Sequence, residues 1–403
     1  MLGRTAANLF WLSRHIERAE NMSRLLDVGY RMSLTEQRGG NGSDHLVSML
    51  RAAEMDEEFA ALDKPANAAN VAHFMLFDAT NPSSVLSCLK QARTNARSER
   101  TSLTTDMWES LNSTWLEFSQ IRPGQVTGSR LPEVLQWIRA ASQRFRGALL
   151  GTILRNEGFA FLQAGTYIER ADNTARILDV KYYVLLPRTN LLGSEIDMLQ
   201  WTLILRAASA HRAYRHMYRE RYQAWNIADF LILRPEMPRS LIYCAQHLNG
   251  SLAMLHLLHG ERGPAHDEAE GLLRMLTENE MDRIFEGGLH EFLTEFIERN
   301  GRLTETLSET YNFTEPGLEP NENSNPASDD LRFRPRAPAH FGSPSGHAQI
   351  VRKPARAFVD RNRRRRRGRG TIQGCLWQHR HAGRQWRAGQ SPRCHGRRPC
   401  GNH

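Results

Sequence analysis

The stretch "TYIERADNTARILDVKYYVLL" at residues 166–186 repeats a pattern that the chain first carries at residues 14–34 as "RHIERAENMSRLLDVGYRMSL". When the two are aligned at an offset of 152, ten of fifteen positions are identical. The identical pairs are Ile16/Ile168, Glu17/Glu169, Arg18/Arg170, Ala19/Ala171, Asn21/Asn173, Arg24/Arg176, Leu26/Leu178, Asp27/Asp179, Val28/Val180 and Tyr30/Tyr182. A match of this length indicates a repeat of a whole unit rather than two helices of similar composition.

A second pair of matching blocks supports this interpretation. "NVAHFMLFDATNPSSVLSC" at residues 70–88 aligns with "NIADFLILRPEMPRSLIYC" at residues 226–244 at an offset of 156, and six positions are identical. Because the blocks follow in the same order at nearly the same offset, the sequence predicts an internal duplication. We expect a first helical repeat at 1–155 and a second at 156–313, packed together as one body.

The spacing of apolar residues predicts an all-α fold. Apolar residues recur three and four positions apart, and the period-two alternation of β-strands is absent. Turn-forming residues divide each half into about five or six helices. We expect Asn81-Pro82 to start a helix, "QRGGNG" at 37–42 to end the first one, "IRPGQVTGSRLPE" at 121–133 to form a loop, and the last helix to run from about Glu280 to Tyr311.

The net charge of +9 is divided unevenly along the chain. From residue 331 onward there are 19 Lys or Arg residues and one acid, so this tail carries about +18 and the body about −9. Residues 314–330 are expected to form a polar linker, and residues 331–403 a disordered Arg-rich tail. Two interpretations of the tail stay open: an arm that binds nucleic acid, or coding sequence read out of frame.

Several observations favour a cytoplasmic protein with a reducing environment. Charged residues follow the apolar run at residues 9–12 too soon for a signal peptide, and no stretch is apolar enough to span a membrane. Cys88 and Cys244 are far apart and suggest no disulfide framework. Both fall inside matching predicted helices, where we expect buried packing.

The charged residues of the repeat allow a structural and a functional interpretation. Glu20–Arg24 and Asp172–Arg176 are acid-to-base pairs four residues apart, which stabilise a solvent-facing helix by roughly 0.2–0.5 kcal/mol each. Arg18 and Arg170 have no acid within reach on their own helices. If the two helices are adjacent, Glu17 is expected to pair with Arg170 and Arg18 with Glu169, which would set the register of the two halves.

In the functional alternative, the same residues face a cleft and the arginines bind a carboxylate, a phosphate or a peptide terminus. Glu17 or Glu169 would then accept a proton. The candidate site, for ligand binding or for ion pairing between the repeats, comprises Glu17, Arg18, Asn21, Arg24, Asp27, Glu169, Arg170, Asn173, Arg176 and Asp179. No residue is assigned a catalytic role.

Other sites have weaker support in the sequence. The body contains no Glu-x-x-His motif of di-metal bundles, and the histidines at 211, 216, 256 and 259 lack dependable ligand spacing. There is no P-loop, nucleophile elbow or dinucleotide fingerprint. We therefore predict no cofactor and no metal.

Several long motifs resemble the bacterial alpha-E domain proteins, an all-helical family of unknown function with a Glu-Arg motif. They are "MLGRTAANLFWLSRHIERAEN", "NPSSVLSCLKQARTNARSERTSLTTDMWESLN", "GTYIERADNTARILDVKYYVLL" and "PRSLIYC", within residues 1–313. The signature falls on Glu17, Arg18, Glu169 and Arg170. Genes of such proteins usually lie beside, or are fused to, those of ATP-grasp ligases and transglutaminase-like proteins, while the basic tail departs from the family pattern.

The resemblance implies an accessory or scaffold protein, rather than an enzyme, that acts with those partners in peptide formation or modification. Two alternatives remain: a helical enzyme or anion-binding protein that uses the paired Glu-Arg motifs, and a nucleic-acid-binding protein that uses the tail.

Overall fold

The computed structural model describes residues 1–35, 43–185, 194–219 and 222–313, which belong to one unit of the chain. The predicted linker and basic tail lie outside the described residues. Within them the chain forms α-helices, two short 3-10 helices and turns, and no β-strand, which confirms the all-α prediction. The α-helices are α1 Gly3–Thr35, α2 Ser43–Ala52, α3 Asp56–Ala60, α4 Ala68–Leu76, α5 Val85–Ser98, α6 Thr105–Ser119, α7 Arg130–Thr152, α8 Glu157–Leu185, α9 Glu195–Ala207, α10 His211–Tyr218, α11 Ala224–Ile232, α12 Leu241–His259, α13 Pro264–Thr277, α14 Met281–Gly287 and α15 Leu289–Thr310.

The helices are more numerous than the five or six expected per half. In the described chain, seven precede residue 155 and eight follow it. The additional ones are short: α3 has five residues, α14 seven and α10 eight. Helices of about two turns or less carry too few apolar positions for three-and-four spacing to reveal them.

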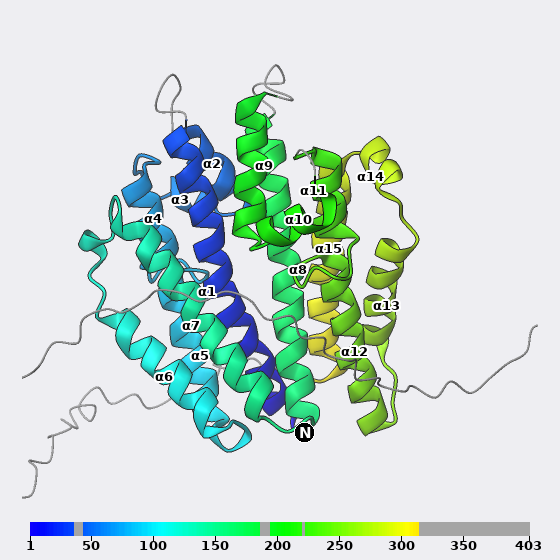
Figure 1. Cartoon of the computed structure of the whole chain (residues 1–403). Coiled ribbons are helices and arrows are strands. Elements are labelled where there is room, and N and C mark those ends of the chain that lie inside the picture. The colour runs from blue at the N-terminus through cyan, green and yellow to red at the C-terminus, as the bar shows by residue number, and fades with distance from the viewer. Residues whose placement is uncertain (36–42, 186–193, 220–221, 314–403) are drawn as a thin grey trace, which may run out of the picture. The chain divides into compact units, whose positions relative to one another are not determined.

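Two long helices, α1 and α8, run side by side through the centre of the bundle (Figure 1). They span 33 and 29 residues and carry the repeated stretches. Helix α5 packs against α1, α12 packs against α8, and α2 contacts both. Because other helices cover the central pair, most of the polar residues of the repeated stretches are buried along with the apolar ones.

The backbones of α1 and α8 come into close contact near their N-terminal halves. A Cβ atom on Gly165 would lie 2.2 Å from the carbonyl oxygen of Phe10, so only glycine fits there without a shift. Next to this contact, the hydroxyl groups of Ser13 and Thr166 lie 3.1 Å apart and share a hydrogen bond. Small residues therefore set the distance at which the longer charged side chains meet.

Two predicted helix boundaries were wrong. Asn81 does not cap a helix: its side chain accepts a hydrogen bond from Ser83 N and donates one to Phe74 O, which stabilises a turn, and α5 is capped by Ser84. The expected last helix is split into α14 and α15 at Gly288, where φ is +97° and the helical hydrogen-bond ladder is interrupted. The predicted loop at 121–133 is largely confirmed, since α7 begins at residue 130.

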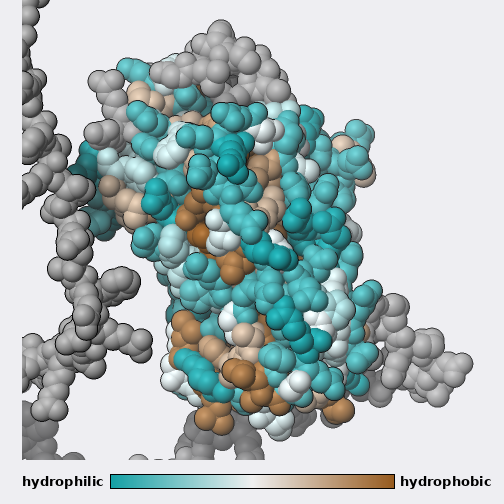
Figure 2. Space-filling view, turned by 90° about the vertical axis from the view of Figure 1, so that its right-hand side faces the viewer, coloured by the Kyte–Doolittle hydropathy of each residue, from teal (hydrophilic) through white to brown (hydrophobic). Residues whose placement is uncertain are grey.

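The surface is mainly hydrophilic, with scattered apolar patches on the face shown in Figure 2. The most exposed large apolar side chains of the described chain include Leu154, at 78%, and Leu257, at 83%. None of the described helices combines the length and the apolar character that a membrane crossing would need.

Candidate functional site

The Glu-Arg motifs of α1 and α8 pair with each other. Arg170 Nε and Nη2 donate to the two carboxylate oxygens of Glu17 at 3.0 and 3.1 Å. Arg18 Nε and Nη2 donate to the two oxygens of Glu169 at 2.7 and 2.9 Å. Both pairs are therefore bidentate, and they confirm the cross-pairing that the isolated arginines led us to expect. This fork-to-fork geometry couples the register of α1 to that of α8.

The pair around Glu17 belongs to a larger buried network, which we call the closed cluster. Its members are Glu17, Glu20, Arg24, Arg146, Arg170 and Arg239. Glu17 meets Arg146 at 2.5 Å and Arg239 at 3.1 Å in addition to Arg170. Glu17 thus contacts three arginines.

Glu20 is the second carboxylate of the closed cluster. Its oxygens lie 2.5 Å from Arg24 Nη2, 2.5 Å from Arg146 Nη2 and 2.6 Å from Arg239 Nη2. The interpretation of Glu20–Arg24 as a solvent-facing pair was wrong, because the two side chains are only 0% and 2% exposed. Helical spacing alone does not distinguish an exposed pair from one that other helices cover. Arg24 also donates to Ala207 O and to Ser209 Oγ, which connects α1 to the end of α9.

Sequence reasoning missed two members of the closed cluster. Arg146 lies on α7, and no local signal connects it to the repeat. Arg239 lies in the block at residues 226–244, at a position where the aligned block at residues 70–88 has Ser83, so identical residues alone did not indicate it. The difference between the two aligned blocks at this position is the signal that could have indicated this arginine.

The pair around Glu169 belongs to the open cluster, formed by Arg14, Arg18, Glu169, Asp172 and Arg176. Arg14 Nε donates to Glu169 at 2.8 Å, and Arg176 Nε donates to Asp172 at 2.7 Å. Arg176 also lies 3.1 Å from Glu54, whose side chain is 70% exposed. The arginines of this cluster are therefore engaged by acids, while one side of the cluster faces a pocket.

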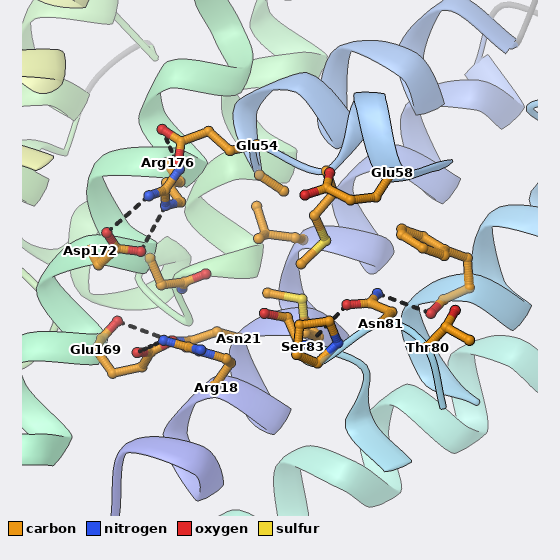
Figure 3. Close-up of a pocket in the computed structure, with 17 residues that line it drawn as sticks. Arg18, Asn21, Glu54, Glu58, Thr80, Asn81, Ser83, Glu169, Asp172 and Arg176 are labelled. Atoms are coloured by element: carbon orange, nitrogen blue, oxygen red, sulfur yellow. Dashed lines mark hydrogen bonds and ion pairs between the residues drawn. The ribbon is translucent and has the colours of Figure 1, made fainter. Parts of the chain in front are cut away.

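The pocket has a volume of about 270 Å³ and lies between α1, α8, the segment from the end of α2 into α3, and the turn before α5 (Figure 3). Its lining residues are Arg18, Asn21, Met22, Leu25, Ala53, Glu54, Met55, Glu58, Phe74, Thr80, Asn81, Pro82, Ser83, Glu169, Asp172, Asn173 and Arg176. The two Glu-Arg helices and residues of the block at 70–88 meet at this cavity.

Two buried asparagines on the pocket wall keep hydrogen-bonding capacity unused by the described chain. Asn173 is 2% exposed, and neither its Oδ1 nor its Nδ2 has a partner. Asn21 is 1% exposed and donates through Nδ2 to Glu169 O at 3.1 Å, while its Oδ1 has no partner. Buried polar atoms are rarely left unsatisfied, so this wall is suited to a polar ligand.

The ten predicted site residues therefore do not form one site. Glu17, Arg24 and Arg170 lie in the closed cluster, and Arg18, Asn21, Glu169, Asn173 and Arg176 line the pocket. The remaining two belong to neither. Asp27 pairs with Arg31 at 2.7 Å and contacts Arg139 at 3.5 Å, whereas Asp179 lies 2.6 Å from His290 Nδ1.

The arginines decide the charge state of the buried acids. Burial opposes ionisation of Glu17, but Arg146, Arg170 and Arg239 outweigh it and lower the pKa of this carboxyl to about 2. Burial also opposes ionisation of Glu169, yet Arg18 and Arg14 lower its pKa to about 2. A carboxylate with so low a pKa is a weak proton acceptor near neutral pH. These glutamates are thus fixed negative charges.

The two body cysteines are buried, as predicted, at the fourth residue of α5 and of α12. Burial raises the pKa of each thiol to about 12, so neither is a ready nucleophile. Their surroundings correspond: among charged groups, Arg18 has the largest electrostatic influence on the thiol of Cys88, and Arg170 has the largest on that of Cys244. Among the residues that the structure describes, no group of three or more acids, histidines or cysteines is arranged to hold a metal ion.

Fold and site together define an all-helical protein in which two central helices exchange Glu-Arg pairs next to a small polar pocket. The chain belongs to the Alpha-E family: the family's model, described as a predicted alpha-helical domain with a conserved ER motif, matches residues 1–312.

The chain is also similar to uncharacterised proteins of Mycobacterium bovis and Mycobacterium tuberculosis. Each is 22% identical over 312 residues, and the match covers 73% of this chain and 35% of the relative. The chain thus spans about a third of the length of these relatives. No solved structure matches it.

Proposed function

We propose that this chain is a helical accessory or scaffold protein of a peptide-forming or peptide-modifying system, with an ATP-grasp-type ligase and a transglutaminase-like protein as partners. The observation that supports the accessory role is that the charged groups of the two Glu-Arg motifs pair with each other. Their guanidinium forks and carboxylates form bidentate pairs between α1 and α8. The choice of partners comes from the family resemblance.

Physical reasoning supports a structural role for the motifs. A buried ion pair is roughly neutral for stability, because desolvation of the charges offsets their attraction. It does penalise any arrangement in which one charge loses its partner. The cross-pairs therefore favour a single register of the central helices, which suits a scaffold that presents fixed surfaces to partner proteins.

The test is affinity capture of the full-length chain from its native host, followed by identification of the bound proteins. We expect an ATP-grasp-type or transglutaminase-like protein to be enriched. A chain that lacks residues 331–403 serves as the matched variant and is expected to fold and to capture the same partners. Capture that finds neither class of protein would contradict the proposed partners.

Ligand binding or catalysis at the pocket is the second candidate function. The unpartnered amide groups of Asn21 and Asn173 favour binding. Catalysis would require that Glu17→Gln or Glu169→Gln abolishes a measurable reaction without a change in thermal stability. Nucleic-acid binding stays a prediction for the tail: it should weaken with added salt and disappear when residues 331–403 are removed. The cytoplasmic location likewise stays a prediction.

We also infer that residues 1–155 and 156–313 arose by duplication. Several contacts support this view. Ser84 caps α5 and Ser240 caps α12 at matching positions. Arg24 contacts Ala207 O and Ser209, while Arg176 contacts Ala52 O and Glu54. Glu54 and Ser209 both have positive φ, 53° and 55°, at equivalent helix ends. Circular dichroism of the separately expressed halves would test whether each half forms helices alone or only in the presence of the other.

A further inference from the structure

The pocket borders a position at which the two aligned blocks differ in charge. In the aligned blocks, Pro82 and Ser84 match Pro238 and Ser240, so Ser83 holds the position of Arg239. Both flanking serines cap the helix that follows. The backbone thus approaches the central helices in the same way in both copies. At this position the first copy has the hydroxyl group of Ser83, and the second has the guanidinium group of Arg239.

Arg239 shows what a guanidinium group does at this position. Its side chain is 7% exposed and points into the bundle, where Nη1 lies 3.1 Å from Glu17 and Nη2 lies 2.6 Å from Glu20. The repeat places Glu169 and Asp172 at the positions of Glu17 and Glu20. Ser83 has no contact with these carboxylates, and it lines the same pocket as they do (Figure 3).

The two copies also differ in how many arginines surround each acid. Glu17 contacts three arginines, whereas Glu169 contacts Arg14 and Arg18. Glu20 contacts three arginines, whereas Asp172 contacts Arg176. Each carboxylate of the open cluster therefore has fewer cationic partners than its counterpart, on the side of the cluster that the pocket occupies.

The charge of the pocket wall favours a cation. Four acids line it, Glu54, Glu58, Glu169 and Asp172, and so do two arginines. Arg18 pairs with Glu169 and Arg176 pairs with Asp172 and Glu54, which leaves the lining with two more negative than positive charges. The Oδ1 atoms of Asn21 and Asn173 add two buried acceptors without partners. A guanidinium group carries five N–H donors and no acceptor, so carboxylates and amide oxygens are the groups it needs.

We propose that this pocket binds a guanidinium group, in the position that the side chain of Arg239 fills in the second copy. The group would come either from a free guanidino compound or from an arginine side chain of a peptide. A volume of about 270 Å³ suits a ligand of this size, since sites for larger organic ligands usually span about 300–1,000 Å³. The proposal goes beyond the accessory role and depends on the correspondence of Ser83 and Arg239.

Calorimetric titration of the full-length chain tests the proposal with two guanidinium probes, agmatine and an N-acetylated, C-amidated arginine. The matched control probe is the citrulline analogue of the second, which has the same shape without the charge. We expect at least one arginine-type probe to bind and the citrulline analogue not to bind. Binding of agmatine alone indicates a free compound as ligand, and binding of the capped arginine indicates a peptide. No binding of either probe overturns the proposal, as does equal binding of the citrulline analogue.

The variant Ser83→Arg tests the location of the site. Its new side chain is expected to occupy the pocket as Arg239 occupies the closed cluster, to raise the melting temperature and to weaken probe binding by about tenfold or more. Ser83→Ala, which removes the hydroxyl group without adding a guanidinium group, is the control and should bind the probe more tightly than Ser83→Arg. Unchanged binding by folded Ser83→Arg contradicts the proposal. If Ser83→Arg does not fold, Asp172→Asn serves instead, and it should weaken binding through the loss of one carboxylate.

The converse variant, Arg239→Ser, gives the second copy the arrangement of the first. Glu17 and Glu20 keep three of their arginines, Arg24, Arg146 and Arg170, so the variant is expected to fold with a lower melting temperature. Agmatine should raise that melting temperature more than it raises that of the unaltered chain. An equal effect on both chains would contradict the equivalence of the two positions. This outcome is independent of whether partner capture succeeds.

Discussion

The closed and open clusters are built from the same residue types at matching positions of α1 and α8, yet they differ in access to solvent. In the closed cluster, Glu17 and Glu20 are 1% and 0% exposed and contact four arginines between them. In the open cluster, Glu169 and Asp172 are 5% and 21% exposed and border the pocket. The comparison teaches that a repeated motif does not define a repeated site. The residues that other helices contribute decide whether a motif is enclosed in an ion-pair network or borders a pocket.

Acidification is expected to have the largest effect on this comparison, because it removes charge from both clusters at once. The folded-state pKa values of Glu17 and Glu169, about 2, lie below the ordinary value of 4.5. Their stabilising contribution is therefore present above about pH 5 and is lost as the pH falls from 4.5 towards 2. Urea denaturation at a series of pH values measures it. The double variant Glu17→Gln/Glu169→Gln should show a smaller loss, and an unchanged pH profile in that variant would contradict the assignment.

Glu17→Gln is expected to have the next largest effect, through the closed cluster alone. The substitution leaves Arg146, Arg170 and Arg239 buried with one carboxylate fewer. Breaking a buried ion pair in this way costs roughly 3–5 kcal/mol. Chemical denaturation of the variant and of the unaltered chain at pH 7 gives the difference in unfolding free energy. A loss below about 1 kcal/mol, the range of surface pairs, would mean that the closed cluster is not buried in solution.

Gly165→Ala tests the backbone contact that brings both clusters together. The new Cβ would lie 2.2 Å from Phe10 O, so α1 and α8 must move apart, at a cost of about 1–3 kcal/mol. Thermal denaturation measures the loss. Gly147→Ala in α7 is the matched control: its Cβ meets no atom within 4 Å, and alanine should stabilise the helix by up to about 1 kcal/mol. Equal effects of the two substitutions would argue against the close contact.

Asp172→Asn is expected to have the smallest effect on stability, because the open cluster is partly solvated. It weakens the Asp172–Arg176 pair, at a cost of roughly 0.3–1 kcal/mol. Parallel denaturation with Glu20→Gln, the matching change in the closed cluster, measures the asymmetry directly. Similar losses in the two variants would remove the distinction between the clusters.

Sequence patterns predicted the cross-pairs because an exclusion argument was available. Neither Arg18 nor Arg170 has an acid one turn away, so each needed a partner on another helix, and the repeat supplied two matching glutamates. The same reasoning failed for Glu20 and Arg24, which satisfy each other within one helix and so gave no sign of burial. Arg146 was missed because its contact to Glu17 spans 129 positions of the chain and has no local signature.

By itself, the sequence determined the helical character of the chain, the similarity of residues 14–34 to residues 166–186, the burial of Cys88 and Cys244, and the pairing of the Glu-Arg motifs. Periodicity and repeated spacing are local properties, so the order of the residues along the chain is enough to recognise them. Only the tertiary structure decided which polar face was buried, where Arg146 and Arg239 joined the closed cluster, and that Ser83 and Glu169 line the same pocket. Burial and charge balance depend on neighbours that are distant in sequence, and those neighbours exist only once α1 and α8 have packed.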